Sequence, residues 1–190
     1  MQSAGPLFVR FLSRCGKEMW GVVSSHESTT AKVAKLAGPS ALSAPSSLSA
    51  SSFAKSSSEA FSLSLDGDET VEIAKLLAPL PVFPPPAIFC IGLNYKRHAA
   101  EVKMDLPKIP VLFLKTPNTV QHPNDPIVIP QVASDPPEVD YECELAVVIG
   151  KACTNVPVER ALEYVLGYTC ANDVTARKWQ GKRGGGQWCR

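Results

Sequence analysis

Two glutamates separated by one residue are the part of the chain best suited to chemistry. Glu142 and Glu144 lie in the run 140–150, which is otherwise mostly apolar and becomes β-branched toward its end. In a strand, residues two apart leave from the same face, so both carboxylates point one way and Cys143 points the other. Such a pair is costly to bury unless a cation neutralises it, and oxygen ligands suit Mg²⁺ or Ca²⁺. A solvated strand face without metal is the alternative.

A histidine and a glutamate form a second candidate pair. His98 and Glu101 are three residues apart in a predicted helix over 94–103, so they are neighbours on one helix face. A carboxylate beside an imidazole orients it and raises its basicity, as a general base requires. An exposed surface pair is the competing interpretation. Asp173, which follows a predicted strand at 168–171, is either a ligand or a helix cap.

Short strands must position these side chains. Besides the glutamate strand, alternating or apolar runs predict strands at 87–92, 111–114, 127–129 and 168–171. Further helices are predicted at 157–166 and 175–180, around 30–36, and over 68–77, where acidic residues open the segment and Pro79 follows it. Short, irregularly spaced strands with occasional helices predict an α+β fold, strand-rich, with a mixed curled sheet.

The N-terminal part divides into two segments. Residues 6–24 alternate apolar and polar side chains around a turn at 15–17, which favours a β-hairpin over the alternative of an arginine-containing mitochondrial transit peptide. Between residues 40 and 64, twelve of twenty-five residues are serine, a composition typical of a flexible segment. We therefore expect a hairpin subdomain at 1–25, a flexible serine-rich linker at 26–69, and a domain at 70–190 that carries the chemistry.

The composition limits which classes of binding partner are expected. The 190 residues are 45% hydrophobic, and their net charge is +1 without a basic stripe, so nucleic acid is not an expected partner. No apolar run approaches the length of a membrane span, and a small-molecule partner is expected. Six cysteines without CxxC spacing indicate a reducing compartment. We expect a cytoplasmic protein, with the mitochondrial matrix as the alternative.

Four motifs, in order along the chain, resemble those of the fumarylacetoacetate hydrolase family. The resemblance is strongest to the family's members called fumarylacetoacetate hydrolase domain-containing proteins. The resemblance covers about residues 70–190, and the hairpin resembles the family's small N-terminal subdomain. The motifs are Ile91-Gly92-Leu93-Asn94-Tyr95 with His98 and Glu101, Phe113-Leu114-Lys115, the run 142–151, and Gly167-Tyr168 with the run 172–177.

The resemblance implies an active site and a reaction. It implies a β-roll fold and a homodimer in the complete protein, with hydrolysis of acylpyruvates, or decarboxylation or tautomerisation of 2-oxo acids such as oxaloacetate, through an enolate bound to Mg²⁺, or alternatively to Mn²⁺ or Ca²⁺. By position it assigns the metal to Glu142, Glu144 and Asp173, catalysis to His98 and Glu101, and substrate contacts to Lys115, Arg177 and Gln180.

The chain also departs from the family. It ends at Arg190, where members continue into further core strands and carry a lysine and a glycine-threonine segment that close the pocket. The sequence therefore predicts a β-roll that is incomplete at the C-terminus and has little activity by itself. The alternative function is that of a truncated, catalytically inactive fragment acting as a binding or assembly module.

Overall fold

The computed structural model describes residues 6–38, 60–181 and 184, which fall into two compact units. We call them the barrel unit (residues 1–83, 121–125 and 145–171) and the site unit (residues 84–120, 126–144 and 172–190). Most of the predicted flexible segment, residues 40–59, lies outside the described residues. Its last residues, 62–64, begin a strand.

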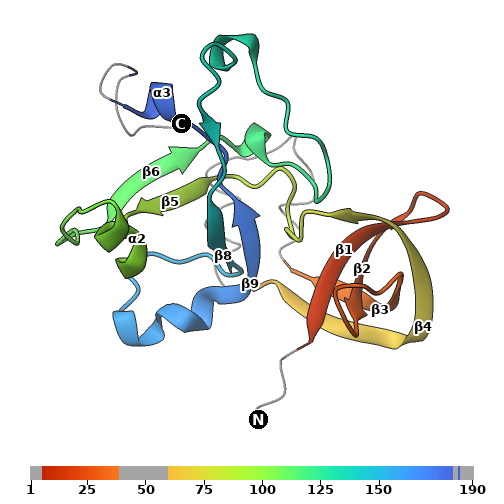
Figure 1. The fold of residues 1–190 in the computed structure, drawn as a ribbon. Coiled ribbons are helices and arrows are strands. Elements are labelled where there is room, and N and C mark those ends of the chain that lie inside the picture. Colours follow the sequence, from red (N-terminus) through yellow and green to blue (C-terminus); the bar gives the residue numbers. More distant parts are fainter. Residues whose placement is uncertain (1–5, 39–59, 182–183, 185–190) are drawn as a thin grey trace, which may run out of the picture. The chain divides into compact units, whose positions relative to one another are not determined.

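Four antiparallel strands close into a small barrel in the order β1-β2-β3-β4 (Figure 1). The predicted hairpin is confirmed, since Leu7 of β1 is in register with Val23 of β2 and Gly16 adopts a φ of +79° in the turn. The strands are β1 (Leu7–Ser13), β2 (Glu18–Val23), β3 (Thr30–Ala37) and β4 (Ser62–Leu77).

The barrel encloses a small apolar core around Phe11, whose side chain is fully buried. Gly21 of β2 is in register with β3, and a Cβ at this position would lie 2.7 Å from the Cβ of Ala31. Glycine therefore allows β2 and β3 to approach closely over the phenylalanine ring.

Two helices predicted in this region are wrong. Residues 30–36 belong to β3, and residues 68–77 belong to β4. Val71 and Ile73 of β4 pack against the core while Thr70 and Glu72 are exposed, which is the two-residue period of a strand. Strand pairing on both edges outweighs the helix-start signal of the acidic residues. Residues 30–37 and 62–69, which the sequence analysis assigned to the linker, are thus strands of the barrel.

The barrel unit also contains most of a two-stranded sheet, β8 (Cys143–Ile149) with β9 (Val165–Asn172). Between these strands, the helix predicted at 157–166 is present as a 3₁₀-helix, Val158–Tyr164. Gly150 at the end of β8 donates its N–H to the carbonyl of Tyr164 at 2.9 Å. The loop before β9 is thus tied to the end of β8.

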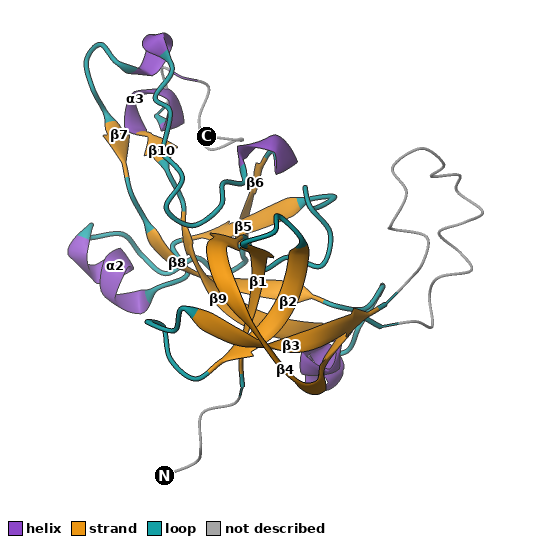
Figure 2. Cartoon of the chain, turned by 90° about the vertical axis from the view of Figure 1, so that its right-hand side faces the viewer, coloured by secondary structure: helices purple, strands orange, loops and turns teal. Residues whose placement is uncertain are grey.

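The site unit is built from short elements (Figure 2). One antiparallel pair is β5 (Ile88–Gly92) with β6 (Val111–Lys115), and another is β7 (Val139–Asp140) with β10 (Thr175–Ala176). The helices are α2 (Lys96–Glu101), α3 (Arg177–Gln180), and the 3₁₀ turns Pro117–Thr119 and Gln131–Ala133. None of the described helices is long and apolar enough to cross a membrane.

The predicted fold class agrees with the structure in part. The chain is strand-rich with short helices, but the described strands form one closed barrel and three two-stranded sheets in place of one mixed curled sheet. The strand predicted at 127–129 is wrong, since these residues are irregular. Pro126 and Pro130 flank them, and proline has no N–H to donate to a neighbouring strand.

Candidate active site

The backbone of the site unit brings two of the predicted carboxylates together. Glu142 immediately precedes β8, and Asp173 immediately follows β9. The N–H of Asp173 donates to the carbonyl of Glu142 at 2.9 Å, and the N–H of Glu142 donates to Oδ1 of Asn172 at 3.2 Å. Glu142 and Glu144 are half-buried, whereas Cys143 between them is exposed, as side chains alternating across an extended backbone should be.

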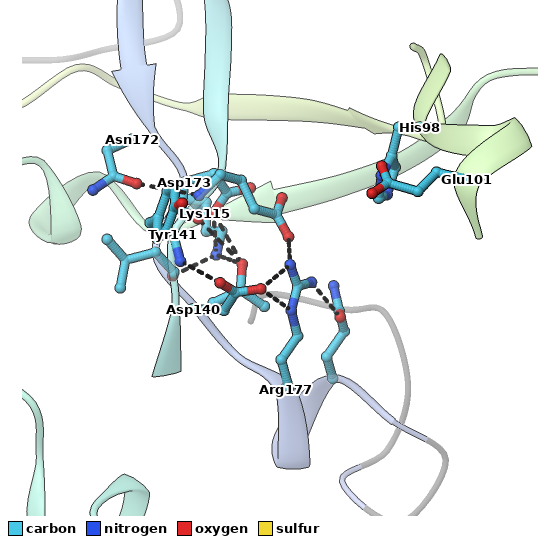
Figure 3. Close-up of polar contacts among 12 residues, drawn as sticks. His98, Glu101, Lys115, Asp140, Tyr141, Asn172, Asp173 and Arg177 are labelled. Atoms are coloured by element: carbon cyan, nitrogen blue, oxygen red, sulfur yellow. Dashed lines mark hydrogen bonds and ion pairs between the residues drawn. The ribbon is translucent and has the colours of Figure 1, made fainter. Parts of the chain in front are cut away.

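Lys115, at the end of β6, makes its closest contact with Asp173. Its Nζ lies 2.5 Å from Oδ1 of Asp173 and also donates to the carbonyl of Val174 at 3.1 Å (Figure 3). The two side chains are 14% and 10% exposed, so this ion pair is nearly buried. Lys115 was predicted to contact the substrate. In the structure it pairs instead with Asp173, one of the predicted metal ligands.

Arg177, the first residue of α3, connects three side chains. Its Nε and Nη2 donate to Oδ2 of Asp140 at 3.0 and 2.9 Å, and its Nη1 donates to Oε1 of Gln180 at 2.9 Å. Nη2 also forms an ion pair with Oε1 of Glu142 (Figure 3). Two of the three predicted metal ligands, Glu142 and Asp173, are therefore each compensated by a cation of the chain.

Glu144 is the third carboxylate, and its environment disfavours its charge. Burial raises the pKa of Glu144, a hydrogen bond from the Tyr95 side chain lowers it, and the negative charges of Glu142 and Asp173 raise it. A positive charge on His98 acts in the lowering direction. The three carboxylates are thus close enough to affect one another, and Tyr95 and His98 lie within electrostatic reach of Glu144.

His98 and Glu101 are neighbours on α2, as predicted, but they are not hydrogen-bonded. Nδ1 of His98 lies 3.9 Å from Oε2 of Glu101, and the side chains are 55% and 81% exposed. A distance of 3.9 Å exceeds that of a hydrogen bond, so the carboxylate does not fix the imidazole by direct donation. In Figure 3 the pair lies to one side of the cluster around Arg177.

The carboxylates fit a hard cation in chemistry, although they are not gathered around one point. In the described part of the chain, no group of three or more His, Cys, Asp or Glu side chains is arranged to hold a metal ion. The donor set is all oxygen, however, and a divalent cation would offset the burial, and relieve the mutual repulsion, that raise the pKa of Glu144. Exchange of Lys115 and Arg177 for a metal would require side-chain movement.

Two residues of this cluster were missed by the sequence analysis. Asp140 continues the spacing of Glu142 and Glu144 by another two residues, which was a usable signal. Tyr95 immediately precedes α2 with an extended backbone, and the first of the family motifs ends on it.

The strand-rich fold and the carboxylate cluster lie in the part of the chain that carries the sequence motifs. The chain belongs to the fumarylacetoacetate hydrolase family, because the family model "Fumarylacetoacetate (FAA) hydrolase C-terminal" matches residues 87–190. All of the candidate site residues lie within this match. Members of the family are typically metal-dependent.

The curated relatives that are similar in sequence to this chain include enzymes named for different reactions. It is 52% identical over 118 residues to the fumarylacetoacetate hydrolase domain-containing protein 2 homolog of Dictyostelium discoideum, covering 62% of this chain and 37% of the relative. It is 46% identical to the mitochondrial oxaloacetate tautomerase fahd2 of Xenopus laevis, covering 60% and 34%. It is also 46% identical to the caffeoylpyruvate hydrolase of Neonothopanus nambi, covering 57% and 38%. The chain therefore spans little more than a third of the length of these relatives.

Solved structures agree on the fold over most of the chain. The fumarylacetoacetate hydrolase of Exiguobacterium antarcticum matches with a TM-score of 0.58 and 27% identity, covering 97% of this chain and 61% of that one. The 5-carboxymethyl-2-hydroxymuconate delta-isomerase of Mycobacterium smegmatis matches with a TM-score of 0.62 and 28% identity, covering 95% and 59%.

Proposed function

We propose that the chain carries the divalent-metal site of an enzyme acting on 2-oxo acids or acylpyruvates, by hydrolysis, decarboxylation or tautomerisation. The observation that carries the proposal is the carboxylate cluster of Glu142, Glu144 and Asp173, two of which hold cations of the chain. Names of relatives support the substrate class, since one is an oxaloacetate tautomerase and another a caffeoylpyruvate hydrolase.

Glu142, Glu144 and Asp173 would hold Mg²⁺, or alternatively Mn²⁺ or Ca²⁺. When bound, the cation would supply a Lewis acid that polarises the substrate carbonyl. Arg177 is held by Asp140 and Gln180. Once Glu142 binds the cation, the guanidinium has N–H donors left at Nη1 and Nη2 that suit the substrate carboxylate. Lys115 would add positive charge beside Asp173 and the substrate.

His98 is the proposed general base. Its Nδ1 faces Glu101, so its Nε2 is the atom left to accept a proton, either from the carbon next to the 2-oxo group in tautomerisation or from water in hydrolysis. For the Glu101 carboxylate to orient the ring, the two side chains must approach from 3.9 Å to hydrogen-bonding distance. The same histidine then returns the proton to the product.

Calorimetric titration with Mg²⁺ tests the metal ligands. We expect saturable binding to the unmodified chain and none to the double variant Glu142→Gln/Asp173→Asn, because two of three charged oxygen donors are lost. The variant Asp105→Asn/Glu159→Gln is the matched control, since it removes the same charge at exposed positions outside the cluster. An unchanged isotherm in a folded Glu142→Gln/Asp173→Asn sample would make the ligand assignment wrong.

A binding or assembly module, including a homodimer, is the second candidate. The observation that favours it is an apolar strand face in the site unit, where Phe89 is in register with Leu114 and Ile91 with Leu112. Phe89 and Leu112 are 68% and 59% exposed. Sedimentation of the chain and of Phe89→Glu tests this role: a dimer in the first and a monomer in the second would support it.

A further inference from the structure

Asp140 is held in a fixed place beside the proposed metal ligands. It lies on β7 in register with Thr175 of β10, two residues before Arg177. The N–H of Arg177 donates to the carbonyl of Glu138 at 2.8 Å, so the backbones of the two segments are tied together. The Oδ1 of Asp140 accepts the N–H of Tyr141 at 2.9 Å, which leaves Oδ2 directed to the guanidinium.

Asp140 and Glu142 share one guanidinium unequally. Asp140 accepts from both Nε and Nη2 of Arg177, whereas Glu142 contacts Nη2 alone. Gln180 takes a third donor at Nη1. Arg177 can therefore release Glu142 and keep three hydrogen bonds, but it cannot release Asp140 without losing two of them.

We propose that Asp140 is a positioning residue that retains Arg177 and so leaves Glu142 able to exchange the guanidinium for a divalent cation. The inference rests on the proposed function for the identity of that cation. Without Asp140, the guanidinium has Glu142 as its remaining charged partner among these contacts, and an arriving cation must compete with it for the same oxygens. With Asp140 present, the Arg177 guanidinium stays near the proposed metal site without occupying the oxygens of Glu142.

Calorimetry with Mg²⁺ on four chains tests the coupling: the unmodified chain, Asp140→Asn, Arg177→Gln and the double variant. We expect Asp140→Asn to weaken Mg²⁺ binding about tenfold, equivalent to about 1.4 kcal/mol. Arg177→Gln should bind at least as tightly as the unmodified chain. The double variant should match Arg177→Gln, because Asp140 acts through the guanidinium.

Glu138→Gln is the matched control, since it removes one negative charge from the residues just before β7 without altering a contact of the guanidinium. We expect it to change Mg²⁺ affinity by less than about threefold, as a through-space effect of one exposed charge does. Equal weakening by Asp140→Asn with and without Arg177 would overturn the proposal, because a general loss of charge or structure would explain it.

A second measurement needs no metal. In the metal-free chain, the Nε–H of Arg177 should exchange slowly by NMR, and Asp140→Asn should accelerate its exchange while Glu138→Gln leaves it unchanged. Unaltered exchange in Asp140→Asn would overturn the positioning role whatever the calorimetry gives. An unmodified chain that binds no Mg²⁺ would contradict the proposed function, and the NMR comparison would still decide whether Asp140 holds Arg177.

Discussion

The Nζ of Lys115 lies 2.5 Å from Oδ1 of Asp173, and the two side chains are only 14% and 10% exposed. The ammonium also donates to the carbonyl of Val174, so it sits against the backbone that leads from β9 into β10. Taking either charge away would leave the other nearly buried and uncompensated. This pair therefore links the candidate metal site to the stability of the site unit.

We expect Lys115→Met to lower the free energy of unfolding of the metal-free chain by about 3 kcal/mol, because Asp173 would lose its cation in a buried setting. Lys115→Met/Asp173→Asn should recover part of that loss. Urea unfolding of both variants checks this, with Lys108→Met at an exposed position as control. A shift no larger than that of Lys108→Met would contradict the buried-pair interpretation.

The pH dependence of stability should report Glu144. Its pKa is raised in the folded chain, chiefly by burial, above the ordinary value of 4.5. A raised folded pKa means that stability is present at low pH and is lost as pH rises through that pKa. We expect this loss in the metal-free chain and not in Glu144→Gln, measured by urea unfolding at a series of pH values.

Tyr95→Phe sharpens the same test. The hydrogen bond from Tyr95 lowers the pKa of Glu144, so its removal should raise that pKa further and move the stability loss to higher pH. NMR titration of the Glu144 carboxyl carbon measures the shift directly. A lower pKa in Tyr95→Phe would contradict the contact.

His98→Ala should separate metal binding from proton transfer. In a chain extended to the length of the curated relatives, we expect this variant to keep the Mg²⁺ affinity of its parent and to lose turnover of oxaloacetate by about 10²-fold to 10⁴-fold, the usual contribution of a general base. The readout is the ratio of the turnover rates with and without the substitution, and each rate is measured from the absorbance of the enol. His26→Ala, at an exposed position in the barrel unit, is the control. Equal rates in the extended chain with and without His98→Ala would remove His98 from the mechanism.

Local patterns predicted the fold where side-chain period and turn chemistry agree. The hairpin at 6–24 follows from alternating side chains and a glycine in the turn, and β5 and β6 follow from short apolar runs. The segment 68–77 was mistaken for a helix because two acidic residues at its start resemble a helix N-terminus. Its pairing with both β1 and β3 is long-range, and only the three-dimensional structure supplies it.

The candidate site was predictable as a set of residues but not as a set of contacts. The spacing of Glu142 and Glu144 predicts same-face carboxylates, and their alternating exposure agrees with it. Spacing carries no information on which cation meets which carboxylate, because those pairs join residues 37 and 58 positions apart, as in Asp140 with Arg177 and Lys115 with Asp173. The spacing of Asp140 could have marked it as a third same-face carboxylate, but its pairing with Arg177 could not be predicted in this way.

The closure of the barrel by β4 has a consequence for the speed of folding. The hairpin of β1 and β2 joins neighbours in sequence, but Arg10 meets Leu77 only when β4 returns across β1. Pairing between such distant positions is slow, because the chain loses the entropy of loop closure before any stabilising contact forms. The entropic cost of closing the loop rises by only about 0.6 kcal/mol for each doubling of the number of residues in it. Lengthening or shortening the serine-rich sequence should therefore alter the rate of barrel formation only modestly, while mutations at the β1–β4 seam should alter it strongly.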